Sequence, residues 1–157
     1  MRHLAIIADG NRRWATSQGL PPELGYNQGL ITIENMCLWA IKNNISYISA
    51  YVFSTENWSR PKNQIQALMS LGDYYAATKV DFYVNNDIKV NFIGRRDRLD
   101  PHFVETINNL ETSTKNGQTL QLIMCLDYGG RDEIVRAIKQ GAQTEEEISS
   151  ILNIYAF

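Results

Sequence analysis

An acid and two arginines directly follow an apolar run near the start of the chain. The run spans residues 4–8, and the residues after it are Asp9, Gly10, Asn11, Arg12, Arg13 and Trp14. Proteins usually hold Mg²⁺ through one or two carboxylates together with the phosphates of a ligand, and arginines form paired hydrogen bonds with phosphate oxygens. Glycine lets the backbone approach such a ligand closely. These residue types therefore indicate a site for a phosphorylated ligand, with a divalent cation at Asp9.

A purely structural interpretation of the same residues is also open. Asp9 could cap a helix that begins after the strand, while Arg12 and Arg13 lie in solvent, because acids and glycines are common at such turns. The spacing within residues 9–13 does not decide between the two interpretations.

Three further polar clusters follow apolar segments that are rich in β-branched and aromatic residues, as strands are. The clusters are Ser54, Thr55, Glu56, Asn57, Trp58, Ser59, Arg60 and Pro61 after segment 45–53; Gly94, Arg95 and Arg96 after segment 88–93; and Asp127, Tyr128, Gly129, Gly130 and Arg131 after segment 120–126. Each cluster combines charged or amide side chains with residues that favour turns.

Helical patterns alternate with these strands. The predicted helices are 23–43, 62–85, 100–112, 132–140 and 145–153, from apolar spacing and from capping residues. This order predicts one α/β domain over residues 1–157, with a mainly parallel central sheet and helices on both faces. Because parallel strands end at the same edge, we expect the four polar clusters to meet there, where open α/β sheets bind ligands. That convergence favours the ligand site over the structural interpretation.

Composition narrows the function further. The chain has 157 residues, 44% of them apolar, and 15 basic against 17 acidic residues, so it can bury a core and has no positive field that favours nucleic acid. No apolar run is long enough to span a membrane and the chain starts without a secretory leader, so we expect a cytoplasmic location. Cys37 and Cys125 lie far apart in apolar surroundings, which predicts buried thiols rather than a disulfide or a metal site.

Taken together, segments 9–14, 53–61 and 128–131 closely resemble the motifs of the cis-prenyltransferases, the undecaprenyl diphosphate synthase family. The resemblance runs from residue 3 to about residue 139, with several motifs in the same order and at similar distances. It implies an enzyme that uses Mg²⁺ to add isopentenyl diphosphate, with Z geometry, to an allylic diphosphate such as farnesyl diphosphate. It also implies a homodimer, and we expect the hydrophobic product to bring the enzyme to a membrane surface.

The resemblance also implies roles for individual residues. Asp9 matches the family's essential aspartate, which positions Mg²⁺ and diphosphate, and Asn57 matches a residue that helps to remove the proton at the condensation step. The other implied substrate-binding residues are Gly10, Asn11, Arg12, Arg13, Trp14, Ser54, Thr55, Glu56, Trp58 and Arg60. The implied lining of a hydrophobic tunnel for the growing chain is Val52, Leu68, Met69, Leu71, Gly72, Tyr74 and Tyr75. The bulk of Val52, Tyr74 and Tyr75 predicts products of short or medium length.

The chain departs from the family pattern at several positions. Pro22 and Tyr26 stand where an arginine and a histidine usually assist diphosphate binding, and Arg95 stands where an acid is usual. The family continues into a segment that binds isopentenyl diphosphate and completes the metal site, whereas this chain ends at Phe157. We therefore expect a C-terminally incomplete fold with an uncovered strand edge. Two alternatives stay open: a fragment or truncation of an enzyme, or a non-catalytic or partner-dependent homologue that binds an isoprenoid diphosphate.

Overall fold

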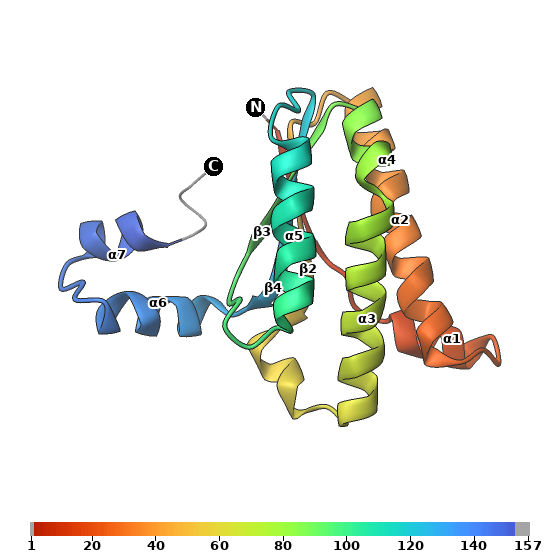
Figure 1. The fold of residues 1–157 in the computed structure, drawn as a ribbon, viewed down its shortest axis with the longest axis horizontal. Helices are drawn as coiled ribbons and strands as arrows, with labels where there is room; N and C mark the ends of the chain where they lie inside the picture. The colour runs from red at the N-terminus through yellow and green to blue at the C-terminus, as the bar shows by residue number, and fades with distance from the viewer. Residues whose placement is uncertain (1, 153–157) are drawn as a thin grey trace.

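A single parallel sheet organises the protein. The computed structural model describes residues 2–152. Its strands are β1 (His3–Ile7), β2 (Tyr47–Ser54), β3 (Ile88–Ile93) and β4 (Leu120–Tyr128). They lie in the order β1-β2-β4-β3, and all three neighbouring pairs are parallel. The predicted parallel α/β architecture is confirmed, and the carboxyl ends of all strands lie at the lower edge in Figure 1.

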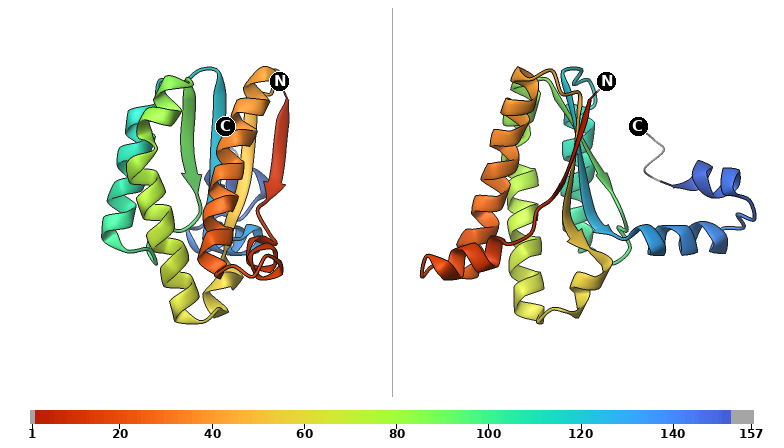
Figure 2. Two further views of the ribbon diagram at one scale, coloured as in Figure 1. Left: turned by 90° about the vertical axis from the view of Figure 1, so that its right-hand side faces the viewer. Right: turned by 180° about the vertical axis from the view of Figure 1, so that it is seen from behind.

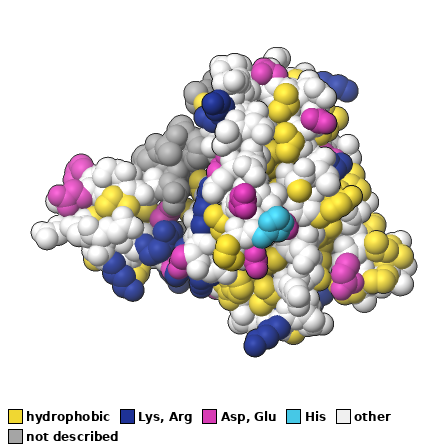
Figure 3. Space-filling model, viewed as in Figure 1, with side chains coloured by type: hydrophobic (Ala, Val, Ile, Leu, Met, Phe, Trp, Pro, Cys, Tyr) yellow, Lys and Arg dark blue, Asp and Glu magenta, His cyan; other side chains and the backbone are white. Residues whose placement is uncertain are grey.

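Helices lie on both sides of this sheet. One face is covered by α2 (Pro22–Lys42), α3 (Lys62–Thr78), α4 (Val80–Asn85) and α5 (Pro101–Thr114). On the other side, α6 (Gly130–Lys139) and α7 (Glu145–Ile151) project from the carboxyl edge, as the two views of Figure 2 show. In the space-filling view they form a lobe beside the main body (Figure 3). The residues predicted as helical beyond 152 lie outside the described part of the chain.

Three local features differ from the sequence prediction. Two short helices at the carboxyl edge were not expected, α1 (Asn11–Ser17) and the 3₁₀ turn η1 (Thr55–Ser59). The helix predicted over 62–85 is interrupted at Lys79, which separates α3 from α4. At that interruption the Lys79 Nζ lies 3.1 and 3.2 Å from the two carboxylate oxygens of Glu34 on α2. Segment 62–85 contains a glycine only at position 72 and no proline, so local sequence does not mark the break.

The main core lies between the sheet and the helices α2 to α5. Its most buried side chains include Ile48, Ile88, Ile107 and Leu122, none of which is exposed to solvent. Burying one such side chain contributes about 1.5–3 kcal/mol to folding. Gly72 leaves room in this layer, because a Cβ there would lie 3.0 Å from the ring of Phe103. The layer therefore fixes α3 and α5 closely against the sheet.

The opposite face of the sheet has a smaller apolar cluster. Ile93, Ile123 and Cys125 are buried there beneath Tyr47, Tyr51 and Tyr128. The hydroxyl of Tyr51 donates a hydrogen bond of 2.6 Å to the backbone oxygen of Tyr128. On the outer strand β1, the side chain of Ile7 is 77% exposed and its strand has no second neighbour among the described residues. None of the described helices is long and apolar enough to cross a membrane.

We expect neither thiol of the native protein to react with a thiol reagent at pH 8. Burial, together with the charge of Glu34, raises the pKa of Cys37 to about 12. Burial and the charge of Glu133 raise the pKa of Cys125 to about 11. Because the thiolate is the reactive form, both groups stay protonated and inert. A colorimetric titration should detect two thiols in guanidinium chloride and none in the native protein; rapid labelling without denaturant would contradict the burial.

Candidate active site

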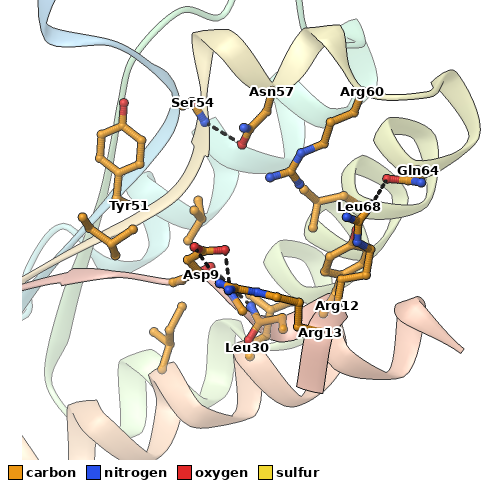
Figure 4. Close-up of a pocket in the computed structure, with 18 of the residues that line it drawn as sticks. Asp9, Arg12, Arg13, Leu30, Tyr51, Ser54, Asn57, Arg60, Gln64 and Leu68 are labelled. Atoms are coloured by element: carbon orange, nitrogen blue, oxygen red, sulfur yellow. Dashed lines mark hydrogen bonds and ion pairs between the residues drawn. The ribbon is translucent and has the colours of Figure 1, made fainter. Parts of the chain in front are cut away.

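A cavity of about 460 Å³ opens at the carboxyl edge of the sheet. It is bounded by the ends of β1 and β2, by η1, and by α1, α2 and α3 (Figure 4). The predicted site residues that line it are Asp9, Gly10, Asn11, Arg12, Arg13, Ser54, Asn57 and Arg60. The first two polar clusters therefore meet, although 40 residues or more separate them in the sequence.

The loop after β1 is held tightly against α2. Gly10 adopts a left-handed φ of 87°, which turns the chain from β1 into α1. A Cβ at Gly25 would lie 2.1 Å from the backbone oxygen of Asn11, and one at Gly29 would lie 2.6 Å from the Asn11 amide nitrogen. Real Cβ atoms do not approach other atoms so closely. The two glycines thus let α2 carry the loop and place Asp9 and Arg13 at the cavity.

Asp9 is an exposed carboxylate beside Arg13 rather than a helix cap. Its Oδ1 accepts a 2.6 Å hydrogen bond from the Gly10 N–H, and its Oδ2 lies 3.2 Å from the Arg13 guanidinium. The side chains of Asp9 and Arg13 are 73% and 78% exposed, so this ion pair is weak and can rearrange around a ligand. The N-cap of α1 is Gly10, without a side-chain cap. The structural interpretation of Asp9 as a cap is therefore wrong.

Two further arginines reach the cavity from different elements. The Nη1 of Arg12 donates a 3.3 Å hydrogen bond to the Oε1 of Gln64 on α3. Arg60 follows η1, and in Figure 4 its guanidinium points into the space above Asp9 and Arg13. Three guanidinium groups and one carboxylate therefore line the same cavity, which suits a ligand with several negative charges.

The turn η1 is closed by a reciprocal pair of hydrogen bonds. Ser54 and Asn57 form a capping box, in which the Oδ1 of Asn57 accepts the Ser54 N–H at 3.1 Å. The pKa of Glu56 lies below its ordinary value, first because a backbone N–H donates to its carboxylate and then because the Ser54 hydroxyl does so. Glu56 is therefore a carboxylate at neutral pH. The capping box gives Asn57 a fixed place at the cavity wall.

Four predicted substrate-binding residues do not line this cavity. They are Trp14, Thr55, Glu56 and Trp58. Trp14 lies on α1 with 44% of its side chain exposed. The Nε1 of Trp58 instead donates a 2.8 Å hydrogen bond to Asp127 at the end of β4.

The two arginines that directly follow β3 are paired with carboxylates. Arg95 pairs with Asp97 and Asp132, and Arg96 pairs with Glu111. Neither of these arginines lines the cavity.

A second, apolar cavity of about 70 Å³ lies beside the first, between the sheet, α3 and α5. Leu30, Val52 and Leu68 line both cavities. Among the predicted tunnel residues, the apolar cavity is lined by Val52, Leu68, Met69, Gly72 and Tyr75, whereas Leu71 and Tyr74 do not line it. Tyr74 is 62% exposed. Leu68, Gly72 and Tyr75 share one face of α3, and Tyr74 is turned away by one position.

Sequence reasoning missed several lining residues. Tyr26, Gly29, Leu30 and Ile33 of α2, with Tyr51 and Gln64, also border the larger cavity. The α2 members recur at three- and four-residue spacing, which was a usable signal for one helix face. Tyr26 therefore reaches the cavity from the position where the related pattern has a histidine.

No group of three or more potential ligands among His, Cys, Asp and Glu occurs in the described residues. Asp9 is the carboxylate that lines the larger cavity. A single carboxylate suits Mg²⁺, which binds commonly through one or two carboxylates with the remaining positions filled by ligand phosphates and water. The donor set thus fits Mg²⁺ that arrives together with a phosphorylated ligand.

Comparison with known proteins agrees with this arrangement. Residues 7–155 match the family described as putative undecaprenyl diphosphate synthase. The chain belongs to this family. An isoprenyl transferase from Aquifex pyrophilus is 41% identical over 158 residues, which cover 97% of this chain and 68% of that relative. The chain spans between 57% and 68% of the length of the curated relatives that it matches.

Two solved structures of this family share the fold. A probable undecaprenyl diphosphate synthase from Campylobacter jejuni superposes with a TM-score of 0.76 at 30% identity, over 96% of this chain and 68% of the other. Lavandulyl diphosphate synthase from Lavandula x intermedia, in complex with dimethylallyl diphosphate, superposes with a TM-score of 0.89 at 25% identity. That match covers 96% of this chain and 70% of the other.

Proposed function

We propose that this chain carries the allylic-diphosphate site of an isoprenyl transferase that adds isopentenyl diphosphate with Z geometry. The observation that carries the proposal is the junction of the two cavities at Leu30, Val52 and Leu68. A charged cavity borders an apolar one, which suits a ligand with a diphosphate head and a hydrocarbon tail. Farnesyl diphosphate has this form.

The charged cavity suits the diphosphate. Arg12, Arg13 and Arg60 supply guanidinium groups, and the backbone at Gly10 allows close approach. Because Asn57 uses its amide oxygen to accept the Ser54 N–H, its amide nitrogen is left to donate to a ligand oxygen. Asp9 would hold Mg²⁺ together with the diphosphate, and the metal would supply charge neutralisation as the diphosphate departs.

The chemistry follows from these positions. The bond between the allylic carbon and the diphosphate oxygen breaks, and negative charge grows on the departing diphosphate. Guanidinium and amide groups that already line the cavity stabilise this growing charge more than they stabilise the bound substrate. The terminal alkene carbon of isopentenyl diphosphate then forms the new bond, and loss of one proton gives the longer allylic diphosphate. We assign Asn57 to the neighbourhood of that proton.

Assembly and location form part of the same proposal. The protein works as a cytoplasmic homodimer, and its hydrophobic product brings it to a membrane surface. The family membership supports these assignments.

Four further residues belong to the proposed substrate site as neighbours rather than as cavity lining. They are Trp14, Thr55, Glu56 and Trp58.

One observation favours binding without elongation as a second candidate. Condensation holds two diphosphates side by side, and like charges 4 Å apart repel by about 4 kcal/mol at an effective dielectric constant of 20. A second set of cations is therefore required. Near the carboxyl edge, Arg95, Arg96 and Arg98 are already paired with carboxylates. Among the described residues, the cationic groups that line the cavity are Arg12, Arg13 and Arg60, which suit one diphosphate.

The proposed function predicts that Mg²⁺ and Asp9 act together in binding. Calorimetry with a non-hydrolysable farnesyl diphosphate analogue should give tight binding only for the parent chain with Mg²⁺. Asp9→Ala should weaken that binding by about tenfold or more, since a hydrogen bond to a charged group contributes about 1.5–3 kcal/mol. Equal affinity in all four combinations of protein and metal would refute the proposed function.

Tail length should depend on Val52 and Tyr75. Val52→Ala and Tyr75→Ala should each raise the affinity for a geranylgeranyl analogue relative to a farnesyl analogue, because each further buried methylene contributes about 0.8 kcal/mol. Tyr74→Ala is the matched control, since Tyr74 is exposed and lies outside the cavity. An unchanged ratio in the Val52 and Tyr75 variants would remove both side chains from the tunnel floor.

The chain alone should not sustain elongation. With Mg²⁺, farnesyl diphosphate and labelled isopentenyl diphosphate, the 157-residue protein should give no multi-unit products. A fusion that continues after Phe157 with the C-terminal segment of a longer relative should give them, because that segment can add the second set of cations. Product analysis by thin-layer chromatography decides the matter. Comparable rates for chain and fusion would show that the second diphosphate site lies within this chain.

A further inference from the structure

Asp127 is a buried acid at an irregular point of the sheet. Its side chain is fully shielded from solvent, and its φ is 49°, in the left-handed region. Phe53 of β2 pairs with Leu126 and Ser54 pairs with Tyr128, so Asp127 is an extra residue on β4. Such bulges next to a functional site often redirect a side chain. Here the bulge brings a carboxylate beneath the loops of the carboxyl edge.

This carboxylate joins three segments of the chain. It accepts a 2.8 Å hydrogen bond from the Trp58 Nε1 and another of 2.8 Å from the Arg98 Nε, and the Arg98 Nη2 also donates to it. The Arg98 guanidinium lies 5.4 Å from the centre of the Trp58 ring. The backbone oxygen of Asp127 accepts the N–H of Arg95 at 3.1 Å. The turn η1, the loop after β3 and the end of β4 thus meet at one residue.

Trp58 carries this connection to the cavity. It lies in η1 between Asn57 and Arg60, which both line the cavity although Trp58 does not. Its ring packs edge to face on Phe53, with the ring centres 5.4 Å apart. A single 3₁₀ turn has poor hydrogen-bond geometry and holds its shape weakly when alone. The indole, held by Asp127, Arg98 and Phe53, ties η1 to β4 and to the loop after β3, whereas the capping box of Ser54 and Asn57 acts only within the turn.

We propose that Asp127 is a positioning residue, which fixes η1 through Trp58 and so sets Asn57 and Arg60 above Asp9. A buried ion pair stabilises a fold less well than apolar packing of the same volume. The carboxylate of Asp127 instead orients its partners, because it accepts hydrogen bonds from an indole N–H and from a guanidinium at the same time. The identity of the ligand that Asn57 and Arg60 bind rests on the proposed function. The hydrogen bond between Asp127 and Trp58 does not depend on that function.

Asp127→Gly is the decisive variant, because glycine accepts the left-handed backbone and removes only the side chain. Asp127→Asn keeps an acceptor oxygen for Trp58 and also tolerates this backbone conformation. Asp87→Gly is the matched control. Asp87 has a φ of 55° and an exposed carboxylate that accepts hydrogen bonds from Gln118 and Thr119, remote from the cavity.

Two readouts separate positioning from stability. The first is the indole N–H resonance of Trp58 in the unliganded protein, one of three such resonances and assigned with Trp58→Phe. The second is calorimetric affinity for the farnesyl analogue with Mg²⁺, at a temperature where each variant is folded. Asp127→Gly should shift the resonance, speed its solvent exchange and weaken binding about tenfold, whereas Asp127→Asn and Asp87→Gly should stay within about threefold.

A folded Asp127→Gly protein with an unchanged resonance and parental affinity would overturn the proposal. If that variant does not fold, Arg98→Gln provides the second test, and it should displace the same resonance and weaken binding several-fold. If Arg98→Gln changes neither the Trp58 resonance nor the affinity, that result also contradicts the proposal. If the parent chain itself does not bind the analogue, the proposed function fails, while the resonance still decides whether Asp127 positions Trp58.

Discussion

Parallel strand pairing is the constraint on which the rest of this molecule depends. Every strand runs in one direction, so every loop that follows a strand arrives at the same edge. Segments 9–14, 54–60, 94–98 and 127–131 can meet there only because of this direction. The regular structure in these segments is short, as in α1 and η1, so contacts with other parts of the chain hold the segments in place. Glycines of α2 seat the first loop, and Asp127 connects the other three.

The site divides sharply by polarity. Its charged part is made by loop and turn residues such as Asp9, Arg13 and Arg60, which remain open to water. Its apolar part is made by α3, α5 and the inner face of the sheet. Polar groups are costly to bury without partners, and apolar groups are costly to expose. Chain direction places these two environments next to one another, and Val52 lies where they join.

Sequence alone was sufficient for the regular elements and for the first contacts of the site. The strand over 88–93 and the helix α2 show clear apolar periodicity, and the structure places them nearly as predicted. The helix α1 spans less than two turns, and η1 spans five residues. Both are largely polar and too short to show an apolar periodicity in the sequence. At the break, Lys79 pairs with Glu34, which is 45 residues away in the sequence.

Tyr74 and Trp58 were expected at the site but line neither cavity, because their positions depend on contacts between distant parts of the chain. Tyr74 and Tyr75 are chemically alike, and only the rotation of α3 against the sheet decides which of them reaches the apolar cavity. Trp58 was expected among the substrate contacts because segment 53–61 resembles a motif of the family. Its actual partner, Asp127, is 69 residues further along the chain and comes close only through the pairing of β2 with β4. Contacts of this range leave no trace in local composition.

The apolar cavity and the core are built from shared side chains. Phe53, Tyr83, Phe103 and Leu126 line the cavity and also belong to the main core. At about 70 Å³ the apolar cavity is much smaller than the charged cavity of about 460 Å³ beside it. A substitution that enlarges this cavity therefore also removes packing from the core, so the size of the cavity and the stability of the fold cannot be changed independently.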